Sequence, residues 1–196
     1  MEILAGTPAV LSPDVMTGLA RYRHRVFIEK LGWELSSEDG QEYDQFDHSD
    51  TTYLIARNEN GSVVGTARLL PTCRPYLLGE VFPDLIGNVP LPCSEDIWEL
   101  SRFAAVDFES KKTGHMSQFS SPVAIGLLRA VLKLAAENGV SRLIMISHLG
   151  VERLLHRAGF VAHRVAPPSI VDGHPLLACW IEVTDEYKTA RPTVLN

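Results

Sequence analysis

The sequence has no long apolar run, few cysteines and no excess of positive charge. None of its apolar stretches approaches the ~18 consecutive residues of a membrane-spanning helix, so no membrane is expected as a partner. The three cysteines, Cys73, Cys93 and Cys179, show no CxxC spacing, which argues against a disulfide framework or a zinc site and favours a reducing cytoplasm. The formal net charge of −6 argues against nucleic acid as the main partner, because phosphate binding needs a basic surface.

Several signatures of catalysis and cofactor binding are absent too. Neither GxSxG nor HExxH occurs, so the sequence gives no support for a serine hydrolase or a zinc protease. Neither GxGxxG nor GxxxxGK[ST] occurs, so dinucleotide and P-loop sites find no support. Residues 1–10 carry no Lys or Arg and lack the positive region of a secretory signal, which again favours the cytoplasm. We expect no metal and no cofactor.

The composition that is present fits a globular protein. Of the 196 residues, 45% are hydrophobic and 21% are charged, which is too apolar for a disordered chain. A chain of this length buries roughly 70% of its unfolded surface in one core. No linker divides the sequence, which therefore predicts a single domain over residues 1–196.

Hydrophobic periodicity and turn residues predict the order of the elements. Ser12 and Pro13 begin a helix that continues to about Lys30, and Asn138-Gly139 end a second helix that begins at Pro122. The same patterns predict strands over residues 51–57, 62–70, 97–106, 142–147, 160–165 and 176–183, and short helices near 77–82 and over 150–158. They also predict an acidic loop over 35–49, a proline-rich loop over 71–92 that contains the first of these short helices, and a polar loop over 109–121. This order predicts an α/β fold, a three-layer αβα sandwich around a central mixed, twisted sheet.

The strand over residues 97–106 places charges among core residues. Since strand side chains alternate between faces, Glu99, Ser101 and Phe103 are expected on one face. Arg102 is expected on the other face, with Trp98 and Leu100. A carboxylate in a central strand is costly unless it is paired. Glu99 therefore either forms a structural ion pair with Arg68 or Arg102, or orients a cation or accepts a proton.

Other charged residues leave similar alternatives open. Asp44 and Asp47 flank Phe46 and either bind a metal or a cationic ligand, although the calcium-loop pattern is absent, or belong to a solvated acidic loop. Arg68 is either a surface arginine at a strand end or part of a site. The arginines of the first predicted helix splay around it, so most of them are expected in solvent; they are Arg21, Arg23 and Arg25.

The order of these residues along the chain is more specific than any one of them. The spacings Arg23-x-x-x-Phe27-x-x-x-x-x-Trp33, Glu42-x-Asp44-x-x-Asp47, Arg68-Leu69-Leu70-Pro71-Thr72 and Trp98-Glu99-x-Ser101-Arg102 occur in this order. The set closely resembles the acyl-homoserine lactone synthases, the LuxI-type autoinducer synthases. The resemblance covers residues 19–160.

The resemblance implies a fold similar to that of the GNAT acyltransferases and an acyl-transfer reaction. The amine substrate would be S-adenosylmethionine and the acyl donor an acyl-acyl carrier protein, giving an N-acyl-homoserine lactone, methylthioadenosine and the free carrier. Glu99 is the expected base, with Ser101 and Arg102 beside it as catalytic residues. The residues expected on the S-adenosylmethionine side are Arg23, Phe27, Trp33, Asp44, Asp47, Arg68, Phe82 and Arg102.

The acyl side is predicted more loosely. The expected acyl pocket consists of Leu100, Phe103, Met145, Ser147 and Leu149. Family members that use 3-oxo chains carry a threonine where we align Met145, so an unsubstituted chain of short to medium length is expected. The pyrophosphate loop of coenzyme A-dependent relatives is absent before Pro122, which favours a carrier protein. Its expected docking residues are Lys111, Lys112, Arg142, Arg153 and Arg157.

Net charge adds one further expectation. Acyl carrier proteins are acidic, so a protein of net charge −6 should carry its charges unevenly. The excess acid should lie in residues 35–50, facing the cationic substrate, and the basic residues should lie on the carrier side.

Two other functions fit the fold class. One is a GNAT-type N-acetyltransferase that uses acetyl-CoA. The other is a non-catalytic module that senses S-adenosylmethionine or an acyl chain, although a sensor would need no base at Glu99.

Overall fold

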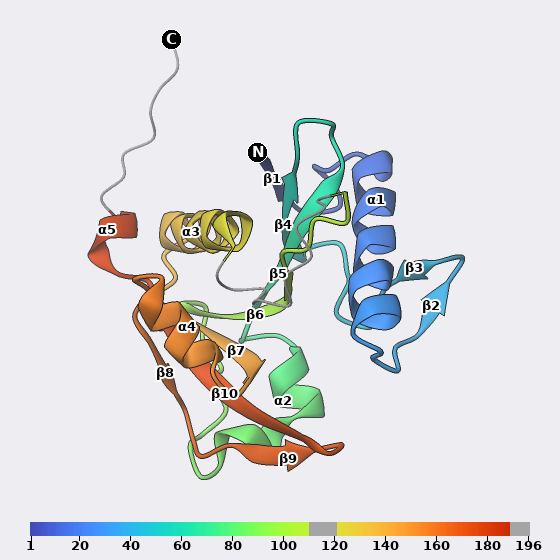
Figure 1. Cartoon of the computed structure of the whole chain (residues 1–196). Helices are drawn as coiled ribbons and strands as arrows, with labels where there is room; N and C mark the ends of the chain where they lie inside the picture. Colours follow the sequence, from blue (N-terminus) through green and yellow to red (C-terminus); the bar gives the residue numbers. More distant parts are fainter. Residues whose placement is uncertain (110–120, 189–196) are drawn as a thin grey trace. The chain divides into compact units, whose positions relative to one another are not determined.

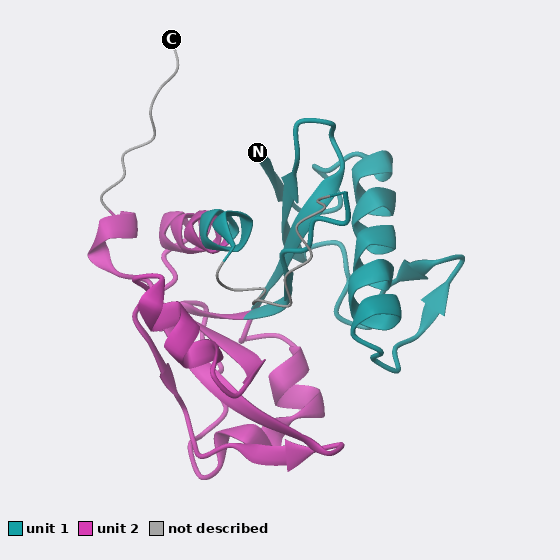
Figure 2. Ribbon diagram, in the orientation of Figure 1, with its two compact units in different colours: residues 1–70, 100–127 teal, residues 71–99, 128–196 magenta. Residues whose placement is uncertain are grey.

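The computed structural model describes residues 1–109 and 121–188. The chain forms two compact units, which Figure 2 colours separately: unit 1 comprises Met1–Leu70 and Leu100–Leu127, and unit 2 comprises Pro71–Glu99 and Leu128–Asn196. Neither unit is one continuous stretch of chain, which is why the sequence shows no linker between them.

Unit 1 is built from a sheet and one long helix. Its strands lie in the order β1-β4-β5-β6, and β4 pairs with β1 and with β5 in antiparallel fashion. The elements are β1 (Glu2–Gly6), α1 (Pro13–Arg23), the π-helix η1 (His24–Lys30), β2 (Ser37–Glu38), β3 (Gln41–Glu42), β4 (Thr52–Arg57), β5 (Val63–Pro71) and β6 (Ile97–Ala104). Figure 1 labels all of them except η1, which follows α1 directly. The first three residues of β6 and the last of β5 belong to unit 2.

The first helix begins where the sequence predicts. The Ser12 hydroxyl accepts a hydrogen bond from the Val15 backbone N–H (3.4 Å), and Pro13 occupies the first turn. Leu19 is fully buried and packs with Tyr53 and Ile55 of β4. After Arg23 the helix continues as η1 rather than as α-helix, a change that hydrophobic spacing does not predict.

Unit 2 contains the remaining strands in the order β6-β7-β10-β8, with β9 also paired to β10. Its elements include α2 (Leu77–Val81), the 3₁₀ helix η2 (Pro83–Ile86), β7 (Arg142–His148), α4 (Val151–Arg157), β8 (Ala162–Arg164), β9 (Ser169–Val171), β10 (His174–Glu182) and α5 (Asp185–Lys188). Helix α3 (Pro122–Glu137) begins in unit 1 and ends in unit 2. Strands β6 and β7 are parallel, with Trp98 opposite Leu143, and β7 and β10 are antiparallel.

The predicted α/β class and the mixed sheet are confirmed, because the parallel β6–β7 pair lies among antiparallel pairs. The sequence patterns missed β1, β9 and α5, which are three to five residues long and contain no buried residue. They also missed the short β2–β3 hairpin inside the acidic loop. The predicted loop over residues 109–121 lies almost wholly outside the described residues. Among the helices described, none combines the length and apolar character needed to cross a bilayer.

Candidate functional site

The centre of unit 1 holds a buried cluster of three arginines and three carboxylates. The arginines come from three different elements, α1, β5 and β6, and the carboxylates come from β3 and the turn that follows it. The members of this cluster, which we call the ion cluster, are Arg23, Arg68, Arg102, Glu42, Asp44 and Asp47. Side-chain exposure is 15% at Asp44 and 5% or less at the other five. Because positive and negative groups are equal in number, their mutual attraction offsets the cost of removing them from water.

Arg23 holds two of the three carboxylates. Its Nε donates to Glu42 Oε2 at 2.6 Å, while Nη1 and Nη2 form a forked pair with the two oxygens of Asp47 at 2.7 and 2.8 Å. Burial alone would raise the pKa of the Asp47 carboxyl, but hydrogen bonds and charge from Arg23, with a further contribution from Arg68, hold that pKa well below its usual range. The pKa of Glu42 is lowered in the same way by Arg23 and Arg102 against the effect of burial.

Arg68 and Arg102 share the third carboxylate. Arg68 Nη1 donates to Asp44 Oδ1 at 2.5 Å, and Arg102 Nη2 donates to Asp44 Oδ2 at 2.7 Å. Arg68 Nε also donates to the Ser101 hydroxyl at 3.0 Å. The remaining nitrogen, Arg68 Nη2, is buried and has no hydrogen-bond partner among the described residues. A buried guanidinium N–H without a partner is unusual and marks a place for an acceptor.

The predicted alternation along β6 is wrong at Arg102. Ser101 and Arg102 were expected on opposite faces, yet both bond into the ion cluster. The cause is the backbone of Arg102, whose φ of +48° lies in the left-handed region. A non-glycine residue in this region is strained, and such strain persists only where its surroundings fix it.

Two aromatic rings lie next to the cluster. Phe27 of η1 stacks on Trp33, with ring centroids 4.9 Å apart and planes 24° apart. The Arg102 guanidinium lies 5.6 Å from the centre of the Phe27 ring. The π-helical turn supports this pair, because the Trp33 N–H reaches back to the Phe27 carbonyl at 2.9 Å. Trp33 remains 39% exposed.

Glu99 lies on the unit 2 part of β6 and is fully buried. Its two carboxylate oxygens accept hydrogen bonds from the backbone N–H groups of Leu77 (3.0 Å) and Leu78 (2.7 Å), at the start of α2. An ion pair of Glu99 with Arg68 or Arg102 stays a prediction. Phe82, half-buried, ends α2.

The residues of the predicted acyl pocket are divided between the units. Met145 and Ser147 lie two apart on β7, so they share one face, and both are buried. The Ser147 hydroxyl has no hydrogen-bond partner among the described residues. Leu149 follows β7 and is 51% exposed. Leu100 and Phe103 are buried on the unit 1 part of β6, and their sharing a pocket with β7 stays a prediction.

Of the predicted docking residues, three are described. Arg153 and Arg157 are exposed on α4, whereas the Arg142 guanidinium lies 5.0 Å from the centre of the Trp180 ring. Lys111 and Lys112 lie outside the described residues. The predicted charge asymmetry needs correction: Glu42, Asp44 and Asp47 belong to the acidic segment, yet three arginines neutralise them, so much of that segment's charge does not face solvent.

The sequence prediction overlooked two members of this site. Glu42 was part of the recognised spacing but was not proposed as a site residue, although it bonds two arginines. Tyr53 of β4 donates to Asp47 Oδ1 at 2.7 Å. The sequence predicted a strand over residues 51–57, but no pattern marks the Tyr53 hydroxyl as paired. Of the helix arginines, Arg21 and Arg25 are exposed as expected and Arg23 is buried.

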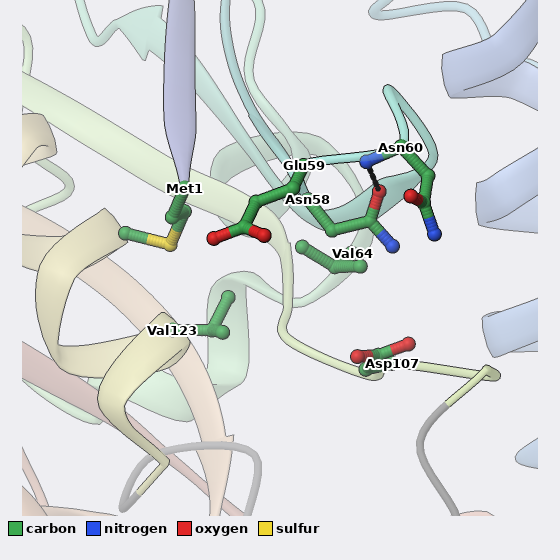
Figure 3. Close-up of a pocket in the computed structure, with 7 residues that line it drawn as sticks. All are labelled: Met1, Asn58, Glu59, Asn60, Val64, Asp107 and Val123. Atoms are coloured by element: carbon green, nitrogen blue, oxygen red, sulfur yellow. Dashed lines mark hydrogen bonds between the residues drawn. The ribbon is translucent and has the colours of Figure 1, made fainter.

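Unit 1 also contains a cavity of about 310 Å³ that none of the predicted site residues lines. Figure 3 shows its lining from the N-terminus, the β4–β5 turn, β5, the segment after β6 and α3: Met1, Asn58, Glu59, Asn60, Val64, Asp107 and Val123. Within residues 1–109 and 121–188, no three His, Cys, Asp or Glu side chains are grouped so as to hold a metal ion.

Comparison with known proteins begins with the fold. An acyl-CoA N-acyltransferase from Pseudomonas aeruginosa superimposes with a TM-score of 0.62 at 17% identity, covering 91% of this chain and 97% of that one. At this identity the match shows the fold alone. The chain therefore has the GNAT-like acyltransferase fold that the sequence predicted.

Closer relatives share the sequence as well. A family model described as autoinducer synthase matches residues 10–190. The acyl-homoserine-lactone synthase of Acinetobacter nosocomialis is 49% identical over 183 residues, which is 93% of this chain and all of that protein. A crystal structure of TofI with an inhibitor and MTA matches at 40% identity and a TM-score of 0.80, covering 93% and 92% of the two chains. The CoA-dependent acyl-homoserine lactone synthase BjaI, solved with SAM and isopentyl-CoA, matches at 30% identity and a TM-score of 0.82, covering 95% and 85%.

These matches define an acyltransferase of GNAT-like fold with a buried ion cluster. The chain belongs to the autoinducer synthase family. The predicted family and the predicted enzyme class are thereby confirmed, and the roles of individual residues stay predictions.

Proposed function

We propose that this chain makes N-acyl-L-homoserine lactones for quorum sensing, with S-adenosylmethionine as amine substrate and an acyl-acyl carrier protein as acyl donor. The observation that carries the proposal is the ion cluster, in which the buried Arg68 Nη2 has no acceptor among residues 1–109 and 121–188, while the Arg102 guanidinium lies over the ring of Phe27, which stacks on Trp33. A ligand with both a carboxylate and a cationic centre suits these groups. Relatives solved with MTA or with SAM support the choice of substrate.

Arg68 is the arginine we assign to the substrate carboxylate. The sequence alone does not distinguish Arg23, Arg68 and Arg102 as partners of the substrate carboxylate. In the structure, however, all three guanidinium nitrogens of Arg23 already donate to Glu42 and Asp47. Asp44, with 15% of its side chain exposed, is the carboxylate best placed to attract the cationic end. The exposed face of Trp33 would take the adenine or the sulfonium, and a cation–π contact of this kind contributes about 1–2 kcal/mol when desolvated.

Acyl transfer needs no covalent enzyme intermediate. A thioester is already activated, so the enzyme must remove a proton from the substrate ammonium, align the amine and stabilise the tetrahedral oxyanion. In our proposal Glu99 accepts the proton of the substrate ammonium, directly or through one water. Backbone N–H groups of the neighbouring strand stabilise the oxyanion by donating hydrogen bonds to it. The amine nitrogen bonds to the acyl carbon, and the carrier thiolate leaves and takes up a proton.

Lactonisation follows as an internal displacement. The substrate carboxylate attacks the carbon next to the sulfonium, the carbon–sulfur bond breaks and methylthioadenosine leaves. This step needs mainly a folded substrate conformation, which the arginine and the aromatic stack would hold.

The role of Glu99 is tested by Glu99→Gln. Loss of a general base lowers kcat by about 10²–10⁴-fold. Because Glu99 also caps α2, circular dichroism and the melting temperature must show that the variant is folded; Gln retains one acceptor oxygen for the Leu77 or Leu78 N–H. Full turnover by a folded variant would remove Glu99 as the base.

The proposed function also covers the acyl donor and the acyl chain that it carries. A carrier protein is favoured because the segment before Pro122 lacks the pyrophosphate loop, although BjaI shows that relatives with a CoA donor exist. An unsubstituted chain of short to medium length is favoured by Met145. The proposed docking residues are Arg142, Arg153 and Arg157, with Lys111 and Lys112. Charge reversal of Arg153 and Arg157 should raise KM for the carrier substrate and weaken its dependence on salt.

One experiment tests the whole proposal. The purified protein is given S-adenosylmethionine with acyl-acyl carrier protein or with the matching acyl-CoA, and mass spectrometry follows the lactone and methylthioadenosine. A lactone formed with the higher kcat/KM from the carrier substrate supports the proposal, and its mass gives the chain. Acetyl transfer to amines without methylthioadenosine release would favour a GNAT-type N-acetyltransferase.

A further inference from the structure

We propose that Glu42 is a positioning residue that sets the affinity of this enzyme for S-adenosylmethionine, although it is not expected to touch the substrate. The inference rests on the proposed function, because it assumes that the ion cluster binds that substrate. Its basis is the place of Glu42 between two arginines that come from separate elements, α1 and β6.

Both carboxylate oxygens of Glu42 are used within the protein. Oε2 accepts from Arg23 Nε at 2.6 Å, and Oε1 accepts from Arg102 Nη2 at 2.9 Å, with Arg102 Nε at 3.2 Å. The residue is fully buried, so water does not compete for these bonds. Glu42 thus connects the β2–β3 hairpin to a helix and to a central strand at one point.

The charge count of the cluster depends on Glu42. Three guanidinium groups face three carboxylates, and removal of one carboxylate leaves an uncompensated positive charge in a buried site. Arg23 and Arg102 would then be drawn to the two carboxylates that remain, Asp47 and Asp44. Asp44 also holds Arg68 Nη1, so the orientation of Arg68 would change with it.

The orientation of the Arg102 side chain also depends on Glu42. Its left-handed conformation, with φ of +48°, directs the guanidinium toward the cluster in spite of strand alternation. Glu42 bonds both Nε and Nη2 of this side chain and therefore fixes it in that orientation. Ser101, the residue before it, accepts from Arg68 Nε. A change at Arg102 would reach Arg68 by this route too.

Glu42 therefore acts through Arg102 and Arg68 Nη2, the group assigned to the substrate carboxylate. It should affect binding of S-adenosylmethionine and leave binding of the acyl donor unchanged. A residue that contributed only to stability would lower the melting temperature of the protein and leave both affinities unchanged in the folded fraction.

The test compares Glu42→Gln with Glu38→Gln, a matched change in the same hairpin at an exposed carboxylate. Calorimetry measures the Kd for S-adenosylmethionine, and steady-state kinetics measure KM for the acyl donor. We expect Glu42→Gln to raise the Kd at least tenfold with KM for the acyl donor within twofold, and Glu38→Gln to match the wild type. Equal Kd values in both variants would overturn the inference.

A double-mutant cycle separates positioning from general destabilisation. In an Arg102→Gln background, Glu42→Gln should raise the Kd by less than threefold, because the group through which it acts is absent. An effect as large as in the wild-type background would contradict the proposed route. Should Glu42→Gln fail to fold, Glu42→Asp replaces it: this variant keeps the charge but shortens the reach, so a wild-type Kd would overturn the inference.

A wild-type protein that neither binds S-adenosylmethionine nor forms lactone would refute the proposed function itself. Wild-type binding with an unchanged Glu42→Gln variant would refute only the positioning role. The two failures are therefore distinguishable in one set of titrations.

Discussion

The two units present their predicted site residues in opposite ways. In unit 1 the site is a set of charged groups, and nearly all their donors and acceptors are paired within the protein. In unit 2 the predicted acyl-pocket residues on β7, Met145 and Ser147, are buried, and the Ser147 hydroxyl has no partner among the described residues. The ion cluster thus pairs its charges within the protein, whereas β7 contributes only an apolar side chain and one hydroxyl to the predicted site.

This difference explains why one substrate is easier to identify than the other. Paired buried charges must keep their residue types and spacing, because each unpaired charge is costly. Aliphatic positions accept many residues of similar size. The ion cluster therefore leaves a specific pattern in the sequence, and the predicted acyl pocket leaves almost none.

The two units should differ most in the free energy of unfolding that is lost when one arginine–carboxylate pair is broken in each. Arg23→Met removes the partner of Glu42 and Asp47 in a fully buried setting and should lower the free energy of unfolding by about 3–5 kcal/mol. In unit 2, Arg164→Met breaks the bond with Glu152 at 2.6 Å, but Arg164 is half exposed, so the loss should stay below about 1 kcal/mol. Urea unfolding measures both. Similar losses would mean that burial does not distinguish the two pairs.

Acid should weaken the protein through unit 1. The pKa values of Asp47 and Glu42 are lower in the folded protein than their ordinary values, so the ionised carboxylates stabilise the fold. This contribution is complete above about pH 5, beyond the unfolded pKa values, and is lost as the pH falls through the folded ones. Unfolding free energies measured between pH 3 and 7 should fall more gently for Asp47→Asn than for the wild type. Parallel curves would exclude Asp47 as a source of the acid sensitivity.

A smaller effect is expected from single tyrosine hydroxyls. Tyr53→Phe removes the bond to Asp47 and Tyr76→Phe removes the bond to the Pro92 carbonyl, and each should cost about 1 kcal/mol of stability. Only Tyr53→Phe, in unit 1, should also raise KM for S-adenosylmethionine, by about twofold to threefold. An equal rise for Tyr76→Phe would end the functional distinction between the units.

The smallest effect is expected at Ser147. Its hydroxyl is buried without a hydrogen bond among the described residues, so Ser147→Ala removes a desolvated group and leaves hardly any space. The melting temperature should stay the same or rise slightly, and kcat/KM with an unsubstituted acyl donor should not change. A clear loss of stability would show that the hydroxyl has a partner after all.

The sequence predicted most elements, and the family resemblance gave every member of the ion cluster except Glu42 as an expected site residue. It failed at Arg102, because alternation assumes an extended backbone and a left-handed residue breaks that assumption. It also failed to see the paired role of Glu42, because an acidic run looks the same whether its carboxylates are solvated or bonded. Glu99 was correctly placed in a buried strand, but its bonds to Leu77 and Leu78 join residues more than 20 positions apart, which no local pattern predicts.

The π-helix His24–Lys30 has a practical consequence for anyone who wishes to make this protein more robust. Substitutions or deletions that restore ordinary α-helical turns would improve local helix propensity. They would also remove the hydrogen bond from the Trp33 backbone N–H to the Phe27 carbonyl and separate the two stacked rings. Selection for heat resistance in this segment should therefore yield tougher but less active proteins, and libraries intended to preserve activity should leave these seven positions unchanged.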